Sequence, residues 1–551
     1  MSQLFAALLR YSSPTQRWIV YGGLLLTGLF PGLLHARNSE EYAGESAKWR
    51  RYQSPHFELF SANDDHESRE LLHNLELLRA LFLENFKLTE RQPMEVTIYY
   101  FNDKDVFFNY VTANLRKNEN LGGYYMSQPD RATIVVSPSW DDESARHMIF
   151  HEYIHHLIRI SGGDPPTWYN EGVAELYSSI EIGKDTLELG KPLPWHIISL
   201  RQKNLYPLEA LFSADRSSSL YNTGTHSGQF YAESWALLHY WYYGESKLDR
   251  AKIGAFMHFI NNETAGTDPA VRRKVFQATM GMDYPAMEEL LERYARAGSY
   301  RWAKVPLPKI SDAKTYTWRK MDFPEIREQL AELDLRANES GKARLAFLRA
   351  VDQVPVKPRR QEVLGADSWM QGEPDRARER WEKAVDEGSD NPAVFHELGL
   401  MESRRWFEHF DYYFRMPSDL AQRLRRLLNR SITCAPEQSD AYEMLAWIEA
   451  TVEKPDIANV NLVQKRFGTL THKGPTLVAL AMLRVHLKDW EAAAEILKQA
   501  EATQPSAALT AVISQIRSHR PSVGVDAATE NAGERLKTID ADGFIIEEPP
   551  Q

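Results

Sequence analysis

Two histidines and an acidic residue near position 150 have the spacing of a metal site. Residues 151–155 read His-Glu-Tyr-Ile-His. Side chains four apart lie on one face of a helix, so His151 and His155 can bind the same ion through their imidazoles. Glu152 then lies beside the open position of the ion, where it can take a proton from metal-bound water. The pattern predicts zinc-dependent hydrolysis, with peptide bonds as the expected substrate.

A second acidic segment follows and can complete the coordination. Residues 170–175 read Asn-Glu-Gly-Val-Ala-Glu and offer Glu171 and Glu175, one helical turn apart. A catalytic zinc site takes three protein ligands and keeps one position open, so one carboxylate is needed. Chain separation alone favours Glu175, and the residue types leave both candidates open. Three stacked histidines span too much helix for one ion, so His147 is expected beside the site or in a structural role, and His156 in a structural role.

The residues before this motif alternate between strand and helix patterns. Strands are expected at 56–60, 94–101, 122–125 and 131–136, and an apolar stripe predicts a helix over 65–87. A mixed sheet packed against the metal-binding helix follows from this order. The segment 131–136 is expected to be an edge strand on which an extended peptide adds as a further strand.

Composition narrows the class of protein. The chain has 551 residues, too many for one ordinary core, and a net charge of −11, which argues against a general nucleic-acid binder. Cys434 is the single cysteine, so no disulfide within the chain is possible. Its expected role is that of a small buried hydrophobic side chain.

The first 36 residues differ from the rest. They contain Arg10 and Arg17, no acidic residue, and an apolar run at 18–34. This pattern predicts a secretory signal peptide, and an uncleaved membrane anchor is the alternative. Both place the later residues outside the cytoplasm, in the periplasm or attached to the cell envelope.

The second half is expected to be helical. Helices are predicted over 195–300, a linker over 301–323 and helical repeats over 324–510. A disordered tail is predicted at 521–551. Small and large residues recur every 34 positions: Leu330-Ala331, Leu364-Gly365 and Leu398-Gly399 open successive units, and Phe347 and Trp381 follow at matching offsets. This helix–turn–helix pattern resembles the tetratricopeptide repeat, which implies a concave surface that binds a protein partner.

The metal motif resembles that of the gluzincin metallopeptidases, in which His-Glu-x-x-His is followed by an Asn-Glu motif on a second helix. The likeness covers roughly residues 50–300, expected as a domain over 45–300, and its later motif is also similar to secreted bacterial peptidase-MA-like proteins. It implies Glu171 as the third zinc ligand, and Glu175 as an acid that hydrogen-bonds a ligand histidine. It also implies a later Tyr or His that stabilises the oxyanion, for which Tyr231 and His226 are the candidates. The gap of 16 residues from His155 to Glu171 is shorter than in thermolysin.

The expected molecule is therefore an α+β zincin-like catalytic domain followed by an all-α tetratricopeptide-like solenoid. Its expected function is zinc-dependent peptidase activity, most simply as an endopeptidase acting on a peptide or protein. One alternative is a non-catalytic assembly protein with a peptidase-like scaffold, against which the intact Glu152 argues. Another is an aminopeptidase, for which the chain shows no Gly-x-Met-Glu-Asn-like segment that would hold a free amine.

Overall fold

The computed structural model describes residues 49–518 apart from short gaps. These gaps are 89, 92–93, 113–114, 117–120, 139–142, 162–164, 216–217, 223, 245–249, 263–267, 339–340, 353–356, 409–414, 469, 471–472, 504 and 506. The expected signal or anchor and the expected tail lie outside the described residues. The described chain forms two compact units. The mixed unit comprises 49–88 and 94–389, and the helical unit comprises 90–91 and 390–518.

A six-stranded mixed sheet is the centre of the mixed unit. Its order is β4 (Gly123–Ser127), β5 (Arg131–Val136), β3 (Glu95–Tyr100), β2 (Phe57–Ser61), β1 (Arg50–Gln53) and β9 (Thr317–Lys320). The strands β2, β3 and β5 run parallel, and β4, β1 and β9 are antiparallel to their neighbours. The mixed sheet expected from the sequence is confirmed. The expectation that residues 131–136 form an edge is wrong, because β5 lies between β3 and β4 and β4 is the terminal strand.

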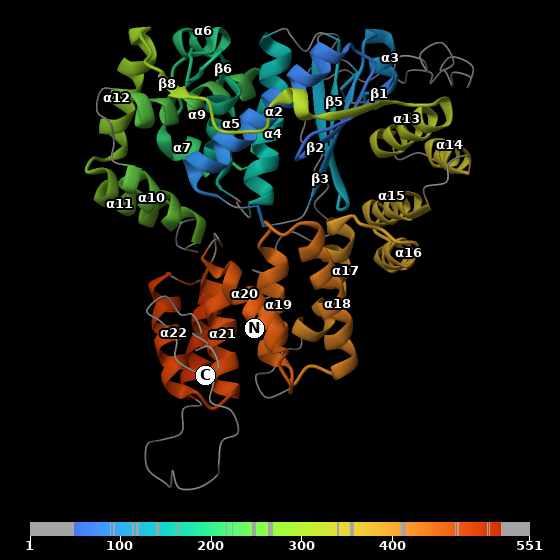
Figure 1. Ribbon diagram of the computed structural model, residues 1–551. Coiled ribbons are helices and arrows are strands. Elements are labelled where there is room, and N and C mark those ends of the chain that lie inside the picture. Colours follow the sequence, from blue (N-terminus) through green and yellow to red (C-terminus); the bar gives the residue numbers. More distant parts are fainter. Residues whose placement is uncertain are drawn as a thin grey trace. The chain divides into compact units, whose positions relative to one another are not determined.

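Each strand sends alternate side chains to opposite faces of the sheet, and each face has its own helices (Figure 1). On one face, Leu59, Ile98 and Ile134 pack in a core with α2 (Asp65–Phe86) and α4 (Glu143–Ile160). On the other face, Phe60 and Tyr99 pack with α3 (Lys104–Asn109) and α13 (Phe323–Asn338). The candidate metal motif lies on α4, so the first face positions the site.

The helices that follow α4 complete the first core. They are α5 (Thr167–Ser178), α6 (Pro194–Gln202), α7 (Leu208–Ser213), α8 (Ser219–Asn222), α9 (Gly224–Tyr243), α10 (Arg250–Asn262), α11 (Pro269–Met280) and α12 (Tyr284–Ala297). Large aromatic side chains, including the fully buried Trp168, Trp235 and Trp241, fill the space between them. The helical character expected for 195–300 is confirmed.

Residues 301–323, expected to be a linker, contribute structure to the mixed unit. Here β8 (Ala303–Pro306) pairs with β7 (Thr186–Leu189), which also pairs with β6 (Glu181–Ile182). After a short 3-10 turn, η2 (Ala313–Thr315), β9 extends the main sheet. The chain therefore returns to the sheet before α13 (Phe323–Asn338) begins.

The first two helix pairs of the region expected to form repeats belong to the mixed unit. They are α13 with α14 (Gly341–Val351), and α15 (Lys357–Met370) with α16 (Pro374–Asp386). Gly365 explains the small residue of the repeat pattern, because a Cβ atom there would lie 2.3 Å from the indole nitrogen of Trp381. A large residue on one helix thus requires a small one on its partner.

A buried network of charged side chains joins α13 and α15 to the sheet. We call it the arginine network: Arg131, Arg336 and Arg359, with Asp130, Glu332 and Glu362. Arg336 binds Asp130 at 2.7 Å and Glu332 at 2.8 Å, and Arg359 binds Glu332 at 2.9 Å. Burial opposes the charge of Glu332, but Arg359 and Arg336 lower its pKa to about 2. The network is a set of buried charges that neutralise one another.

The helical unit contains seven further helices. They are α17 (Pro392–Glu408), α18 (Ser418–Cys434), α19 (Asp440–Thr451), α20 (Ile457–Phe467), α21 (Lys473–His486), α22 (Trp490–Ala502) and α23 (Ala507–Ser518). Packing of α17 on α18, of α19 on α20 and of α21 on α22 continues the paired arrangement. The all-α character of this part is confirmed. No helix within the described residues is both long and apolar enough to cross a membrane.

The loop between α2 and β3 also belongs to the helical unit. The backbone carbonyls of Glu90 and Arg91 accept hydrogen bonds from the amides of Ser439 and Asp440, at the start of α19. The guanidinium of Arg91 binds Asp440 at 2.5 Å and Glu443 at 3.2 Å. Amides at a helix start have no partner within the helix, so this loop supplies acceptors that α19 lacks.

Candidate metal centre

The helix that carries the motif lies close against the edge of the sheet. A Cβ atom on Gly122 would lie 2.2 Å from the Cβ of Ala145 on α4, and one on Gly123 would lie 3.1 Å from Cγ1 of Ile149 on the same helix. These two glycines therefore allow α4 to approach β4 closely. Between its two histidines, α4 buries Tyr153 and Ile154 in the core, and this fixes the rotation of the helix.

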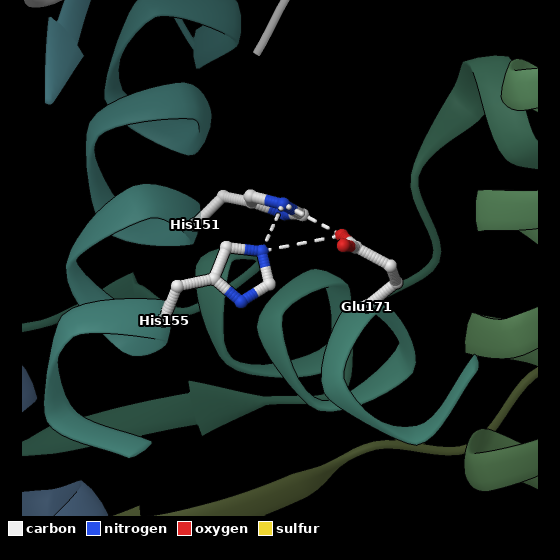
Figure 2. Close-up of side chains that lie close together, drawn as sticks. All are labelled: His151, His155 and Glu171. Carbon is white, nitrogen blue, oxygen red and sulfur yellow. Dashed lines mark hydrogen bonds and ion pairs between the residues drawn. The ribbon is translucent and has the colours of Figure 1, made fainter. Parts of the chain in front are cut away.

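His151, His155 and Glu171 bring three ligand atoms together (Figure 2). The two Nε2 atoms of His151 and His155 are 3.0 Å apart, and each lies 3.2 Å from Oε2 of Glu171. Tetrahedral zinc with bonds of about 2.0 Å requires ligand atoms about 3.3 Å apart. All three residues are at least nine-tenths buried. Within the described residues this is the one cluster of His, Cys, Asp or Glu with the geometry of a metal site.

Asn170 orients one of the two histidines. Its Oδ1 atom lies 3.1 Å from Nδ1 of His155. When that oxygen accepts the Nδ1 proton, the lone pair on Nε2 of the neutral ring is free to bind a cation. The Asn of the Asn-Glu motif thus prepares a ligand on the other helix.

Glu175 lies behind the other histidine and not among the three converging atoms. Its carboxylate is 3.4 Å from Nδ1 of His151, and 2.9 Å from Nε2 of both His147 and His196. Burial acts to raise the pKa of Glu175, but His196, His147 and His151 together hold it well below its usual range. A charged Glu175 favours a proton on Nδ1 of His151, which leaves Nε2 to face the cluster.

Without a metal ion, the cluster holds a proton that a bound cation would displace. Burial acts to raise the pKa of Glu171, but His155 and His151 lower it to about 2. Burial acts to lower the pKa of His151, but Glu175 and Glu171 raise it to about 9. Two neutral imidazoles and a carboxylate are a ligand set that suits Zn²⁺ better than Mg²⁺ or Ca²⁺, which prefer oxygen.

Glu152 follows His151 directly in the sequence, and its side chain is buried. It is 3 % exposed, and its Oε2 atom has no hydrogen-bond partner among the described residues. Burial raises the pKa of this carboxyl group, although His151 and His155 act against the rise. A buried carboxylate oxygen without a partner is costly, so such atoms in native proteins usually serve a ligand or a reaction.

Two tyrosines from later helices lie at the centre. The ring of Tyr231 on α9 is 6.0 Å from that of His151, and burial raises its pKa well above the usual range, so it stays a neutral donor. The hydroxyl of Tyr221 on α8 donates to Oε1 of Glu171 at 3.1 Å. Tyr221 and His196 lie on helices that carry no recognisable motif, so the sequence gives no signal for their place at this centre. His226 lies on α9, and its side chain is outside the described part of the structure.

Gly172 explains how α5 and α9 deliver their residues to one place. A Cβ atom at this position would lie 2.6 Å from the carbonyl oxygen of Ser234 on α9. The glycine after Glu171 therefore lets the two helices touch, with Glu171 on one and Tyr231 on the other.

His156 has the structural surroundings expected of it. Its Nδ1 atom lies 2.8 Å from the hydroxyl of Tyr125, and its ring stacks on Tyr153. Burial lowers its pKa well below the usual range, so it stays neutral.

Comparison of the chain with protein-family models and with curated proteins gives no match. The interpretation of the site therefore depends on its geometry and chemistry.

Proposed function

We propose that this protein is a zinc-dependent peptidase, with His151, His155 and Glu171 as the metal ligands. The observation that carries the proposal is the triangle of ligand atoms, 3.0 to 3.2 Å on each side, together with a carboxylate oxygen of Glu152 that has no hydrogen-bond partner among the described residues. A structural zinc site is closed by four protein ligands, whereas three ligands leave a position for a reactant.

The residues have separate roles in peptide hydrolysis. Zinc, when bound, supplies a Lewis acid and makes water acidic enough to react near neutral pH. Glu152 takes a proton from the attacking water and passes it to the leaving amine. Tyr231, held neutral by burial, donates a hydrogen bond to the carbonyl oxygen as negative charge develops on it.

The location and partner follow from the sequence. The proposal places the enzyme outside the cytoplasm, on the pattern of residues 1–36. The paired helices from α13 to α22 support a role in binding a protein partner or substrate, which is the use that helical repeats commonly serve.

Replacing the base tests the reaction. We expect Glu152→Gln to keep its zinc and to lower the cleavage rate of an unfolded protein such as casein by about 10²- to 10⁴-fold, because the amide cannot accept the proton. The matched control is Glu143→Gln, an exposed position on the same helix, which should leave the rate unchanged. Equal rates for wild type and Glu152→Gln would refute the proposed base.

A further inference from the structure

The helix α6 presents two large apolar side chains to solvent on one face. Trp195 is 38 % exposed and Ile198 is 55 % exposed. Residues three apart are neighbours on a helix surface, so the two form one apolar patch. The intervening His196 points the other way and is buried against Glu175.

This patch continues into the metal centre through successive ring contacts. The indole of Trp195 meets the ring of His147 edge-on, with centroids 5.2 Å apart, and the ring of His147 is 6.0 Å from that of His151. The side chains of His147 and His151 keep 12 % and 11 % of their surface exposed. An extended peptide advances about 3.3 Å per residue, so Trp195 is within about three to four residues of a bond held at the metal.

Other exposed apolar side chains of the described residues lack this combination. Trp318 lies on β9, at the opposite end of the sheet from β4, where it stacks on Tyr52. Trp302 is covered in part by the ammonium group of Lys191. Neither of these tryptophans lies on a helix, and the other exposed large apolar residues of the described part (Leu345, Ile457 and Leu487) are each isolated in sequence.

We propose that Trp195 and Ile198 form an apolar subsite that binds a large hydrophobic side chain of a peptide, two to four residues from the bond to be cleaved. The peptide as ligand rests on the proposed function. An exposed indole and a branched aliphatic chain gain free energy by burying apolar surface and offer no counter-charge to a carboxylate side chain. The enzyme would therefore select its cleavage positions by a residue at some distance from the reacting bond.

The test measures binding, so that it does not depend on catalysis. Glu152→Gln protein loaded with zinc is titrated with blocked octapeptides that carry Phe or Glu at one position, scanned along the peptide. We expect tighter binding with Phe at one position. Adding Trp195→Ala should lower the affinity for that Phe peptide about tenfold and the affinity for the Glu peptides less than twofold. Ile198→Ala should have a smaller effect of the same kind, and Trp318→Ala none.

The outcomes separate the subsite from the reaction. Suppose that wild-type protein cleaves peptides. The subsite is then refuted if the Trp195→Ala variant still prefers Phe. It is also refuted if this variant, at unchanged zinc content, binds all peptides more weakly by the same factor. If the Phe preference depends on Trp195 but wild-type protein cleaves nothing, the subsite stands and the peptidase proposal fails. If no peptide binds, both fail.

Discussion

The mixed unit buries two clusters of charged and polar side chains, one on each face of its main sheet, and they differ in how their charges are satisfied. In the arginine network each guanidinium faces carboxylates at hydrogen-bonding distance, so the positive and negative groups complete one another. In the metal centre two imidazole nitrogens and a carboxylate oxygen converge on one point. Lone pairs that converge in this way can bind a proton or a metal ion, whereas the arginine network contains guanidinium groups that stay charged.

This difference separates a cluster of ion pairs from one with the geometry of a metal site. Buried ion pairs fix the geometry of the elements that they join, and removing one partner leaves a charge without compensation. In a cluster of converging ligand atoms the positive charge is a proton on His151, which a metal ion can displace. The contrast predicts that changes to the two clusters have different consequences.

The largest expected effect is that of Glu171→Ala on bound metal. Loss of one of three ligands should leave the purified protein without stoichiometric zinc, as measured by elemental analysis, while its circular dichroism stays that of the folded protein. Glu143→Ala is the control, because that residue is exposed on the same helix. Zinc retained by Glu171→Ala and lost by Glu175→Ala would reverse the ligand assignment.

Next in size is the effect of Arg336→Ala on stability. The change removes the guanidinium that binds both Asp130 and Glu332, and these two carboxylates stay buried. We therefore expect the free energy of unfolding to fall by about 3–5 kcal/mol. Denaturant unfolding followed by tryptophan fluorescence measures this. Arg319→Ala, which breaks an exposed pair with Glu325, should cost less than about 1 kcal/mol. If the folded Arg336→Ala protein also lost its zinc, the two clusters would not be independent.

A smaller effect is expected for Glu175→Gln. The amide removes the negative charge that His151, His147 and His196 share, so His151 is less well oriented and a weaker ligand. Zinc affinity should fall about 10- to 100-fold without loss of the site, as competition with a chelator would show. An unchanged affinity would mean that Glu175 serves the fold alone.

The smallest expected effect is the change in zinc affinity caused by one pH unit. The pH dependence also differs between the two clusters. In the metal-free centre the pKa of His151 is about 9, so below that pH zinc must displace a proton. Its affinity should fall up to about tenfold for each pH unit below 9. The pKa of Glu332 is about 2, lower than in the unfolded chain, so its contribution to stability is present above about pH 4.5 and is lost as pH falls toward 2. Zinc affinity that does not change between pH 9 and 6 would contradict the first expectation.

The parts of the fold that follow local periodicity could be predicted from the sequence. The helix at 65–86 and the strands at 95–100 and 131–136 have strong apolar patterns, and the structure places them within a residue or two of expectation. The histidine spacing and the acidic motif likewise specify helix faces, and the structure brings His151, His155 and Glu171 together.

Features that depend on contacts between distant segments could not be predicted. Strand order depends on contacts between distant segments, so no local sequence pattern indicates that β4 is an edge strand. The strands β8 and β9 read Ala-Lys-Val-Pro and Thr-Trp-Arg-Lys, are largely exposed and have little apolar pattern, and therefore resembled a linker. The repeat period was visible, but nothing in it showed that the units up to residue 389 fold with the sheet. Tyr221 and His196 reach the centre only through the packing of helices.

The contacts of Glu90 and Arg91 have a practical consequence for anyone who wishes to isolate the mixed unit. A gene fragment that simply stops at codon 389 would still encode these residues but not α19, and the carbonyls of Glu90 and Arg91 would lose the amides that they bind. The guanidinium of Arg91 would lose its two carboxylates as well. A fragment that ends at residue 389 should be more soluble if residues 89–93 are also replaced by a short polar linker between α2 and β3.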